Sequence, residues 1–376
     1  MKLVIAPDSF KGTLTAQEAA SALGQGVARM CPDADLDLCP MADGGEGTVL
    51  AMVAAIGGKL RTETVSGPLG EDIEAVFGLI HRPGTDDLTA VVEMAAASGL
   101  PLVPREHRDP GRTTTFGTGE LIRAALDAGA REIILGIGGS ATVDGGTGCL
   151  QALGIRFLDA SGAILAERLC GGELRSIAAI DAGGLDPRFG ETSVRVACDV
   201  TSPLLGLSGA AEVYGPQKGA TPAAVRELEA GLEHLASLSG SRELADHPGA
   251  GAAGGLGFGL AAFLGATLEP GLPLVAEAVG LRERLLGADL CITGEGRLDA
   301  QSSAGKTAVG VARIAADLGV PVICIPGQAD AAAPFELFDR VHPIVGSGVG
   351  LDDALAHPRP WLARRAAEAV ARFVNP

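Results

Sequence analysis

Short apolar runs that alternate with helical periodicity recur along the whole chain. The run Lys2–Ala6 predicts a strand, and Thr15 with Glu18 three residues later predicts a capped helix that continues to about Arg29. The run at about 35–41 predicts a second strand, and a second helical pattern follows it. These two units are βα repeats whose strands end in polar, glycine-containing turns, which is typical of an α/β fold.

The same patterns continue through the rest of the chain. Alternation between Gly/Pro turns predicts three strands within residues 59–95, at 60–65, 73–80 and 88–94. Further strands are predicted at 132–137, 194–197, 290–292 and, last, 321–325, and helices at 113–128, 222–239 and 360–373. The uncharged stretch Pro248–Leu268 contains seven glycines and has no basic flank, so it predicts a turn leading into a buried helix rather than a membrane span.

Composition supports the α/β interpretation and limits the kinds of binding partner that the protein can have. The chain has 376 residues, 47% hydrophobic but only 3% aromatic, which suits layers of Ala, Val, Leu and Gly and allows two domains. A net charge of −17 argues against nucleic acid and anionic membranes as partners. The seven cysteines are scattered without C-x-x-C pairs and no signal-peptide pattern is visible, so we expect a reduced, cytoplasmic protein.

Carboxylates follow strand after strand. They stand beside or close to glycine or proline at Asp8, Asp43, Asp144, Asp199 and Glu295. Ligands of open α/β sheets bind outside the carboxyl ends of the strands, so we expect several of these groups to converge. Helix N-capping by Asp accounts for about half of such positions without any ligand.

The stretch 290–312 combines features that suit phosphate and metal. An apolar run ends in Gly294, Glu295 and Gly296, then come Arg297 and Asp299, and Gly305-Lys306-Thr307 leads into a helical pattern. Glycines let backbone amides approach an anion, a helix N-terminus attracts it, and a carboxylate can hold Mg²⁺. The stretch is not a Walker A loop, because Ala300 stands where the first glycine is required and the strand ends too early.

Lysine usage gives a second indication of an anion site. Only five of the 29 basic residues are lysines, and three of these, Lys11, Lys218 and Lys306, lie in glycine-containing turns. A compact ammonium suits a phosphate oxygen. We expect function at Lys11 and Lys306 and leave Lys218 open. No G-x-S-x-G, H-E-x-x-H or Cys/His metal spacing occurs.

Taken together, these motifs resemble the bacterial glycerate kinase family, of the glycerate 2-kinase type. The matching segments lie at 6–13, 41–48, 93–100, 136–146, 198–200, 214–220, 254–259 and 294–302, and they span nearly the whole chain. The resemblance implies ATP-dependent, Mg²⁺-assisted phosphorylation of D-glycerate, with the 2-hydroxyl as the favoured position. It also implies a Rossmann-like domain (1–62 plus 285–376) with a second α/β domain (63–284) inserted and the active site in the cleft between them. Whether the protein forms a homodimer stays open.

Chemistry then suggests roles for individual residues. Phosphoryl transfer needs positioning and charge neutralisation, so we expect cations at Lys11, Lys306 and Arg297 and a base or orienting group at Asp8 or Asp43. The metal ligands are predicted to be Asp199 and Glu295, with Asp299 as a further ligand. The predicted nucleotide-binding positions are Gly138, Gly139, Ser140, Thr142, Gly255, Gly257, Gly294, Gly296 and Arg297.

Three alternatives stay open. The first is a kinase that acts on another small hydroxy acid or sugar acid, or that forms 3-phosphoglycerate. The second is a non-catalytic sensor of an organic acid, which is disfavoured because a sensor for an anionic acid gains nothing from so many strand-end carboxylates. The third is a dehydrogenase, which is disfavoured because Gly136-Ile-Gly-Gly-Ser-Ala141 matches a dinucleotide-binding turn poorly.

Overall fold

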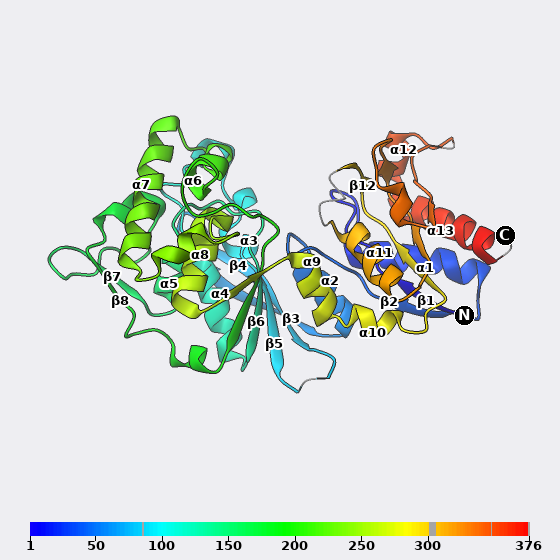
Figure 1. The fold of residues 1–376 in the computed structure, drawn as a ribbon, viewed down its shortest axis with the longest axis horizontal. Helices are drawn as coiled ribbons and strands as arrows, with labels where there is room; N and C mark the ends of the chain where they lie inside the picture. Colours follow the sequence, from blue (N-terminus) through cyan, green and yellow to red (C-terminus); the bar gives the residue numbers. More distant parts are fainter. Residues whose placement is uncertain (85, 301–305, 347, 375–376) are drawn as a thin grey trace.

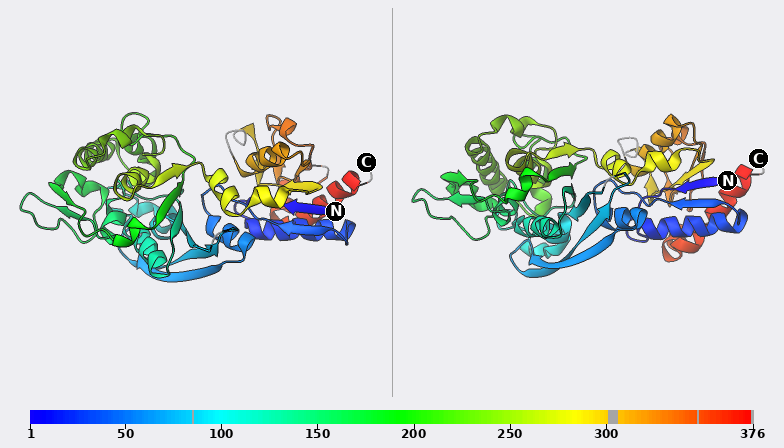
Figure 2. Two further views of the ribbon diagram at one scale, coloured as in Figure 1. Left: turned by 60° about the horizontal axis from the view of Figure 1, so that its bottom comes forward. Right: turned by 90° about the horizontal axis from the view of Figure 1, so that it is seen from below.

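The structure is a computed structural model that describes residues 1–84, 86–300, 306–346 and 348–374. Two lobes lie side by side along the longest axis in all three views (Figure 1, Figure 2). The terminal lobe contains both chain ends and a five-stranded sheet, and the central lobe contains a six-stranded sheet built from the middle of the sequence. The α/β class is confirmed.

The terminal lobe is a parallel sheet in the order β15-β13-β11-β1-β2. Its strands are β1 (Lys2–Ile5), β2 (Asp35–Leu38), β11 (Leu290–Thr293), β13 (Val322–Cys324) and β15 (Arg340–Val341). A short parallel pair, β12 (Arg297–Leu298) with β14 (Gln328–Ala329), extends from it. The helices are α1 (Ala16–Met30), α11 (Thr307–Asp317), α12 (Leu351–Ala356) and α13 (Pro358–Val374).

Alternation along the strands sends side chains to two apolar layers. On one face Leu3 and Ile5 pack with α1 and α13, and on the other Val4 packs with α11. The predicted capping box of α1 is confirmed: the Glu18 amide donates to Thr15 Oγ1 at 3.2 Å, and the Thr15 amide donates to Glu18 Oε2 at 2.9 Å.

The central lobe is a mixed sheet in the order β10-β9-β6-β5-β4-β3. The pairs β3–β4 and β4–β5 are antiparallel, and β5, β6, β9 and β10 run parallel. The strands are β3 (Lys59–Ser66), β4 (Asp72–His81), β5 (Leu88–Glu93), β6 (Glu132–Gly136), β9 (Ser193–Ala197) and β10 (Thr267–Glu269). The strands β7 (Arg156–Leu158) and β8 (Ala179–Asp181) form a separate two-stranded antiparallel sheet. Its helices are α3 (Ala95–Ser98), α4 (Phe116–Asp127), α5 (Thr147–Ala152), α6 (Ala210–Tyr214), α7 (Pro222–Leu238) and α8 (Ala252–Leu264).

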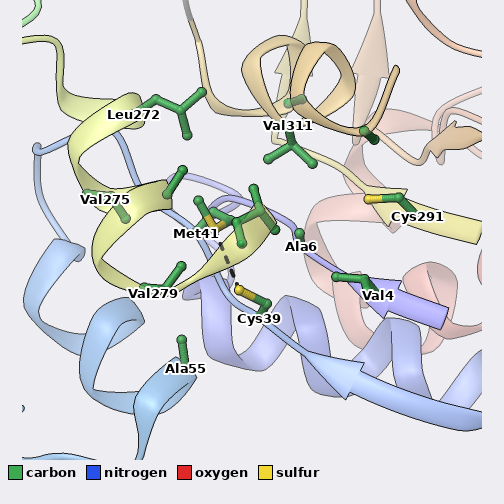
Figure 3. Packing of buried hydrophobic residues seen from close by; sticks show 14 of the residues in the cluster. Val4, Ala6, Cys39, Met41, Ala55, Leu272, Val275, Val279, Cys291 and Val311 are labelled. Atoms are coloured by element: carbon green, nitrogen blue, oxygen red, sulfur yellow. Dashed lines mark hydrogen bonds between the residues drawn. The ribbon is translucent and has the colours of Figure 1, made fainter. Parts of the chain in front are cut away.

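Three helices fill the space between the two sheets: α2 (Thr48–Ile56), α9 (Gly271–Ala278) and α10 (Leu281–Leu285). Figure 3 shows Leu272 of α9 near Met41 and Val311 of the terminal lobe, and Val279, which follows α9, near Cys39 and Ala55. The same buried cluster includes Ile80, Val91, Ile134 and Ala197 on the six-stranded sheet. One hydrophobic core therefore runs from one sheet to the other.

Most predicted elements are present, including a buried helix α8 within Pro248–Leu268. One prediction is wrong: the strand at 321–325 is not the last, because the two-residue strand β15 pairs beyond it. The proposed domain boundaries stay a prediction. In the described ranges, none of the helices is both long and apolar enough to cross a membrane.

Candidate active site

The terminal sheet reverses its winding between β1 and β11. The chain passes from β1 to β2 on one side, whereas β11, β13 and β15 follow on the other. The carboxyl ends of β1 and β11 therefore flank the crevice where ligands of doubly wound sheets bind. Asp8 follows β1 and Glu295 follows β11, and the Asp8 amide donates to the Gly294 carbonyl oxygen at 2.9 Å, which joins the two turns.

Asp8 is held rigidly at this switch point. Its Oδ2 accepts a hydrogen bond from Thr307 Oγ1 at 2.6 Å, and its Oδ1 accepts one from the Ser9 amide at 2.6 Å. Burial raises the pKa of Asp8; the Thr307 bond opposes that effect, and the nearby Asp43 charge adds to it. Thr307 begins α11, so the Lys306-Thr307 turn supports the carboxylate that follows β1.

The turn that carries Asp43 packs closely against the central lobe. Gly44 has φ +87°, and a Cβ there would lie 2.4 Å from the Cβ of Ala197 at the end of β9. A Cβ on Gly271, before the body of α9, would lie 1.7 Å from the Asp43 carbonyl oxygen. Only glycine fits at these two contacts, which fix Asp43 at the junction of the lobes.

Asp199 lies close to Asp43 from the other side. Its Oδ1 accepts a hydrogen bond from the Gly271 amide at 2.8 Å. Burial raises the pKa of Asp199, and the Asp43 charge raises it further. Asp43 thus interacts electrostatically with both Asp8 and Asp199, so three of the five strand-end carboxylates converge as expected.

A smaller cavity of about 340 Å³ opens on the terminal lobe. Charged lining residues come from the strand-end turns and the start of α11: Asp8, Lys11, Asp43, Glu295, Arg297 and Lys306. An aliphatic wall comes from residues 344–345 and 351–358 and includes Ile344, Val345, Leu351 and Leu355. A cavity with charged groups and an aliphatic wall suits a ligand with an apolar part and an anionic part.

A larger cavity of about 730 Å³ opens toward the central lobe. Its lining includes Asp43, Glu46, Glu93 and Asp199 on the acidic side, and Gly138, Gly139, Ser140, Tyr214 and Lys218. Lys11 and Asp43 line both this cavity and the smaller one. Lys11 also lines a third hollow of about 580 Å³ beside α1 and α2. The Lys11 side chain is exposed, and no hydrogen bond or ion pair holds it among the described residues.

Lys218 is buried at the wall of the larger cavity, with only 2% of its surface exposed. Its Nζ donates to Ser140 Oγ at 2.7 Å and to the Thr142 carbonyl oxygen at 2.7 Å. Burial lowers the pKa of this ammonium to about 7, and Asp144 partly offsets the effect. Lys218, for which the sequence leaves a functional role open, therefore lies at the wall of the candidate site.

Glu93 is a site residue that the residue-by-residue prediction omitted. It ends β5, lines the larger cavity and the third hollow, and accepts the Val49 amide at 2.7 Å in the first turn of α2. Burial raises its pKa, although amides at the start of α2 oppose the shift. The rule that strands end in carboxylates applies to Glu93 as well and would have found it.

The other predicted residues are distributed unevenly. Lys306 Nζ contacts Asp299 Oδ1 at 3.0 Å, and Arg297 pairs with Asp330 at 2.9 Å, both at or near the smaller cavity. Gly255 and Gly257 lie behind the wall, where Cβ atoms would meet the backbones of Gly145 and Gly249. The positions with predicted roles that do not line the cavities are Thr142, Gly255, Gly257, Gly294 and Asp299; Gly305 lies outside the described residues.

The surroundings of Asp144 indicate a structural role rather than ligand binding. It is fully buried and accepts hydrogen bonds from the Thr115 amide at 2.8 Å, from Thr115 Oγ1 at 2.7 Å and from the Gly146 amide at 3.1 Å. These donors account for its position at a strand end without a ligand.

The carboxylates suit Mg²⁺ chemically, although Asp199, Glu295 and Asp299 do not form one cluster. The described residues hold no group of three or more His, Cys, Asp or Glu side chains arranged for a metal ion. Mg²⁺ is usually bound by one or two carboxylates, with phosphate oxygens and waters completing its shell. Asp8 and Glu295, which both line the smaller cavity, fit that requirement.

Comparison with known proteins identifies the class of the chain. The model of the "Glycerate kinase family" matches residues 3–375. A "Glycerate kinase" of Halalkalibacterium halodurans is 50% identical over 359 residues, covering 94% of this chain and 93% of that one. A "Glycerate 2-kinase" of Escherichia coli is 51% identical over 331 residues, covering 87% of this chain and 85% of that one.

The crystal structure of a Salmonella typhimurium LT2 protein, named provisionally as glycerate kinase 2, superposes with a TM-score of 0.90 at 47% identity. The match covers 100% of this chain and 98% of that one. Fold, site and comparisons thus define an enzyme of the kinase class. The chain belongs to the glycerate kinase family, and the resemblance seen in its sequence motifs is confirmed.

Proposed function

We propose that the protein transfers the γ-phosphoryl group of ATP to the 2-hydroxyl of D-glycerate. The observation that carries the proposal is that Lys11 and Asp43 line both cavities and so stand at their junction. Two ligands bound on either side of these residues would meet at the same point. The 2-position is supported by the relative named "Glycerate 2-kinase".

We assign the smaller cavity to the nucleotide. The aliphatic wall at 344–345 and 351–358 suits an adenine ring, and Lys11, Lys306 and Arg297 supply charge for its phosphates. Gly296 lines this cavity, and Gly294 binds the Asp8 turn behind it. Phosphoryl transfer depends on charge neutralisation, so these cations are needed in an otherwise acidic protein.

We assign Asp43 as the group that orients the attacking hydroxyl and accepts its proton. It reaches both cavities, whereas Asp8 lines the nucleotide side and Asp199 the acid side. Asp8 and Glu295 would hold Mg²⁺, which supplies charge neutralisation between the phosphate oxygens when bound. Asp199 then orients the acid rather than the metal, and Asp299 acts through its ion pair with Lys306.

An assay of Mg·ATP with D-glycerate, read by ³¹P NMR, tests the proposal. A 2-phosphoglycerate signal is expected; a 3-phosphoglycerate signal would correct the position, and transfer only to other hydroxy acids in a substrate panel would correct the substrate. The absence of ADP release with every acid of the panel would refute the proposal.

A matched pair of variants tests the role of Asp43. Asp43→Asn is expected to lower kcat by about a hundredfold or more, because general base catalysis contributes about 10²–10⁴-fold. Asp35→Asn, on the exposed edge strand β2, is the control and should keep the wild-type kcat. Equal kcat values in the two variants would remove Asp43 from the proton transfer.

A further inference from the structure

We propose that Lys218, Ser140 and the backbone amides of residues 138–140 form the site that binds the carboxylate of the acid substrate. The inference rests on the proposed function and adds to it a binding site at the central-lobe wall of the larger cavity. Each part of this anion site contributes a hydrogen-bond donor, and the cavity is lined by all of the residues concerned.

Lys218 has no carboxylate partner among the described residues. Its Nζ contacts two neutral acceptors, and no carboxylate oxygen lies within 4.0 Å of it among the residues that the structure describes. An ammonium has three N–H donors, so one is left for a ligand in the cavity. A buried charge without a counterion is costly, and an anion bound beside it would offset that cost.

Asp144, whose negative charge acts on Lys218, does not serve as its counterion. Asp144 affects Lys218 electrostatically, but its oxygens accept hydrogen bonds from Thr115 and Gly146. Asp144 also has no exposed surface and does not line the cavity. A counterion for the protonated form of Lys218 would therefore come from the cavity.

The turn that follows β6 presents backbone amides to the same cavity. Gly138 and Gly139 are exposed at the cavity wall, and Gly139 has φ +75°, a conformation that glycine adopts easily. In the described parts of the chain, the amides of Gly138, Gly139 and Ser140 donate no hydrogen bond, whereas the Gly139 carbonyl accepts the Leu100 amide at 2.8 Å. Successive amides without partners form a concave anion-binding turn.

Ser140 completes the arrangement. Its hydroxyl accepts the bond from Lys218, so its own hydrogen stays available for a ligand. The ammonium, the hydroxyl and the amides thus belong to one connected set of donors. A planar carboxylate with two oxygens can accept from such a set, as in other charge-assisted sites.

A carboxylate fits this site better than a nucleotide phosphate, the ligand expected from the glycine pattern. The larger cavity is also lined by Asp43, Glu46, Glu93 and Asp199, which repel a polyphosphate more strongly than a singly charged acid. The aliphatic wall at 344–345 and 351–358 lies in the smaller cavity, on the terminal lobe. With its carboxylate at Lys218, the acid extends its hydroxyl groups toward Asp43 and Lys11.

Binding of D-glycerate alone and of MgADP alone, measured by isothermal titration calorimetry, tests the inference. Lys218→Met and Ser140→Ala should each weaken D-glycerate binding, by about tenfold or more for Lys218→Met, and leave MgADP binding within about twofold. Lys59→Met, at the exposed start of β3, is the matched control and should change neither. Melting temperatures show that each variant is folded, and Ser140→Ala keeps the test valid if Lys218→Met does not fold.

The outcomes separate this inference from the proposed function. Lost MgADP binding with retained acid binding would overturn the inference in favour of a phosphate site, and unchanged binding of both ligands, or a wild-type protein that binds no D-glycerate, would overturn it outright. A wild-type protein that binds D-glycerate through Lys218 but transfers no phosphoryl group would refute the proposed function alone. Turnover with an unchanged KM for D-glycerate in Lys218→Met would refute the inference alone.

Discussion

Among single residues, Lys218 links binding to protonation. Burial lowers its pKa to about 7, so between that value and the ordinary lysine pKa of 10.5 the folded chain binds fewer protons than the unfolded chain. Stability therefore rises with pH through this window, because folding releases the proton of Lys218 and this release becomes more favourable as the pH rises. An anion beside Lys218 favours the charged form and acts in the opposite direction.

We therefore expect D-glycerate to bind with uptake of a proton at pH 8. Calorimetric titrations in two buffers of different ionisation enthalpy measure this uptake directly. It should shrink toward pH 6, where Lys218 is already protonated, and it should vanish in Lys218→Met. Uptake that persists in that variant would assign the proton to another group.

The hydrogen bond between Thr307 and Asp8 leads to a second prediction. Since this bond lowers the pKa of Asp8 against the effect of burial, Thr307→Val should raise that pKa further. If Asp8 acts in its ionised form, the acidic limb of the kcat/KM profile should move to higher pH in this variant. Thr307→Ser keeps the hydroxyl and should keep the wild-type profile. An unshifted limb in Thr307→Val would show that ionisation of Asp8 does not limit activity.

At the scale of elements, the turn 43–45 and the start of α9 depend on glycine. A Cβ on Gly271 would lie 1.7 Å from the Asp43 carbonyl oxygen, so Gly271→Ala must displace the Asp43 turn or α9. Either shift also strains the bond from the Gly271 amide to Asp199. We expect turnover to fall about a hundredfold, as misplaced catalytic groups do.

Gly190→Ala is the control for this substitution, because a Cβ at Gly190 meets no atom within 4 Å. It should leave turnover and the melting temperature unchanged. A Gly271→Ala variant with normal turnover would mean that the turn adapts and that the contact does not position Asp43.

Most elements could be predicted because their patterns are local. The capping box at Thr15 and the apolar runs that form β1, β6 and β11 are patterns of neighbouring residues alone. The sequence patterns did not predict β10, which has three residues, or β15, which has two. They also did not predict α9, whose first turn contains Gly271 and Pro273. Such elements form through packing against the rest of the fold rather than through local preference.

The site was predictable in its parts but not in its arrangement. Carboxyl ends of parallel strands share one edge, which accounts for the convergence of Asp8 and Asp43 on the terminal sheet. Asp199 follows β9 of the other sheet, so its place beside Asp43 depends on how the two lobes pack. The burial of Lys218 depends on tertiary contacts with Ser140 and Thr142 far away in the sequence, and no local pattern reveals it. Gly255 and Gly257 resemble a ligand-binding turn, yet their lack of side chains serves close packing against Gly145 and Gly249.

For the whole molecule, the continuous core determines how the two lobes behave. Leu272 and Val275 of α9 belong to one buried cluster with Val4 of the terminal sheet (Figure 3). The same cluster includes Ile134 of the central sheet. Domains that touch only through a polar surface move independently by default. A shared apolar core couples the lobes instead, and the fixed position of Asp43 follows from it.

This coupling predicts that both lobes unfold together. Leu272→Ala leaves a cavity in the shared core and should lower the free energy of unfolding by about 2–5 kcal/mol. In urea, fluorescence of Trp361, the single tryptophan and a terminal-lobe probe, should report the same midpoint as far-UV circular dichroism of the whole chain. Leu207→Ala, at a position 91% exposed, should shift neither midpoint. Midpoints that separate in the wild-type chain, with Leu272→Ala moving only one of them, would show that the lobes unfold independently and that closure around the substrate can occur by hinge motion across this core.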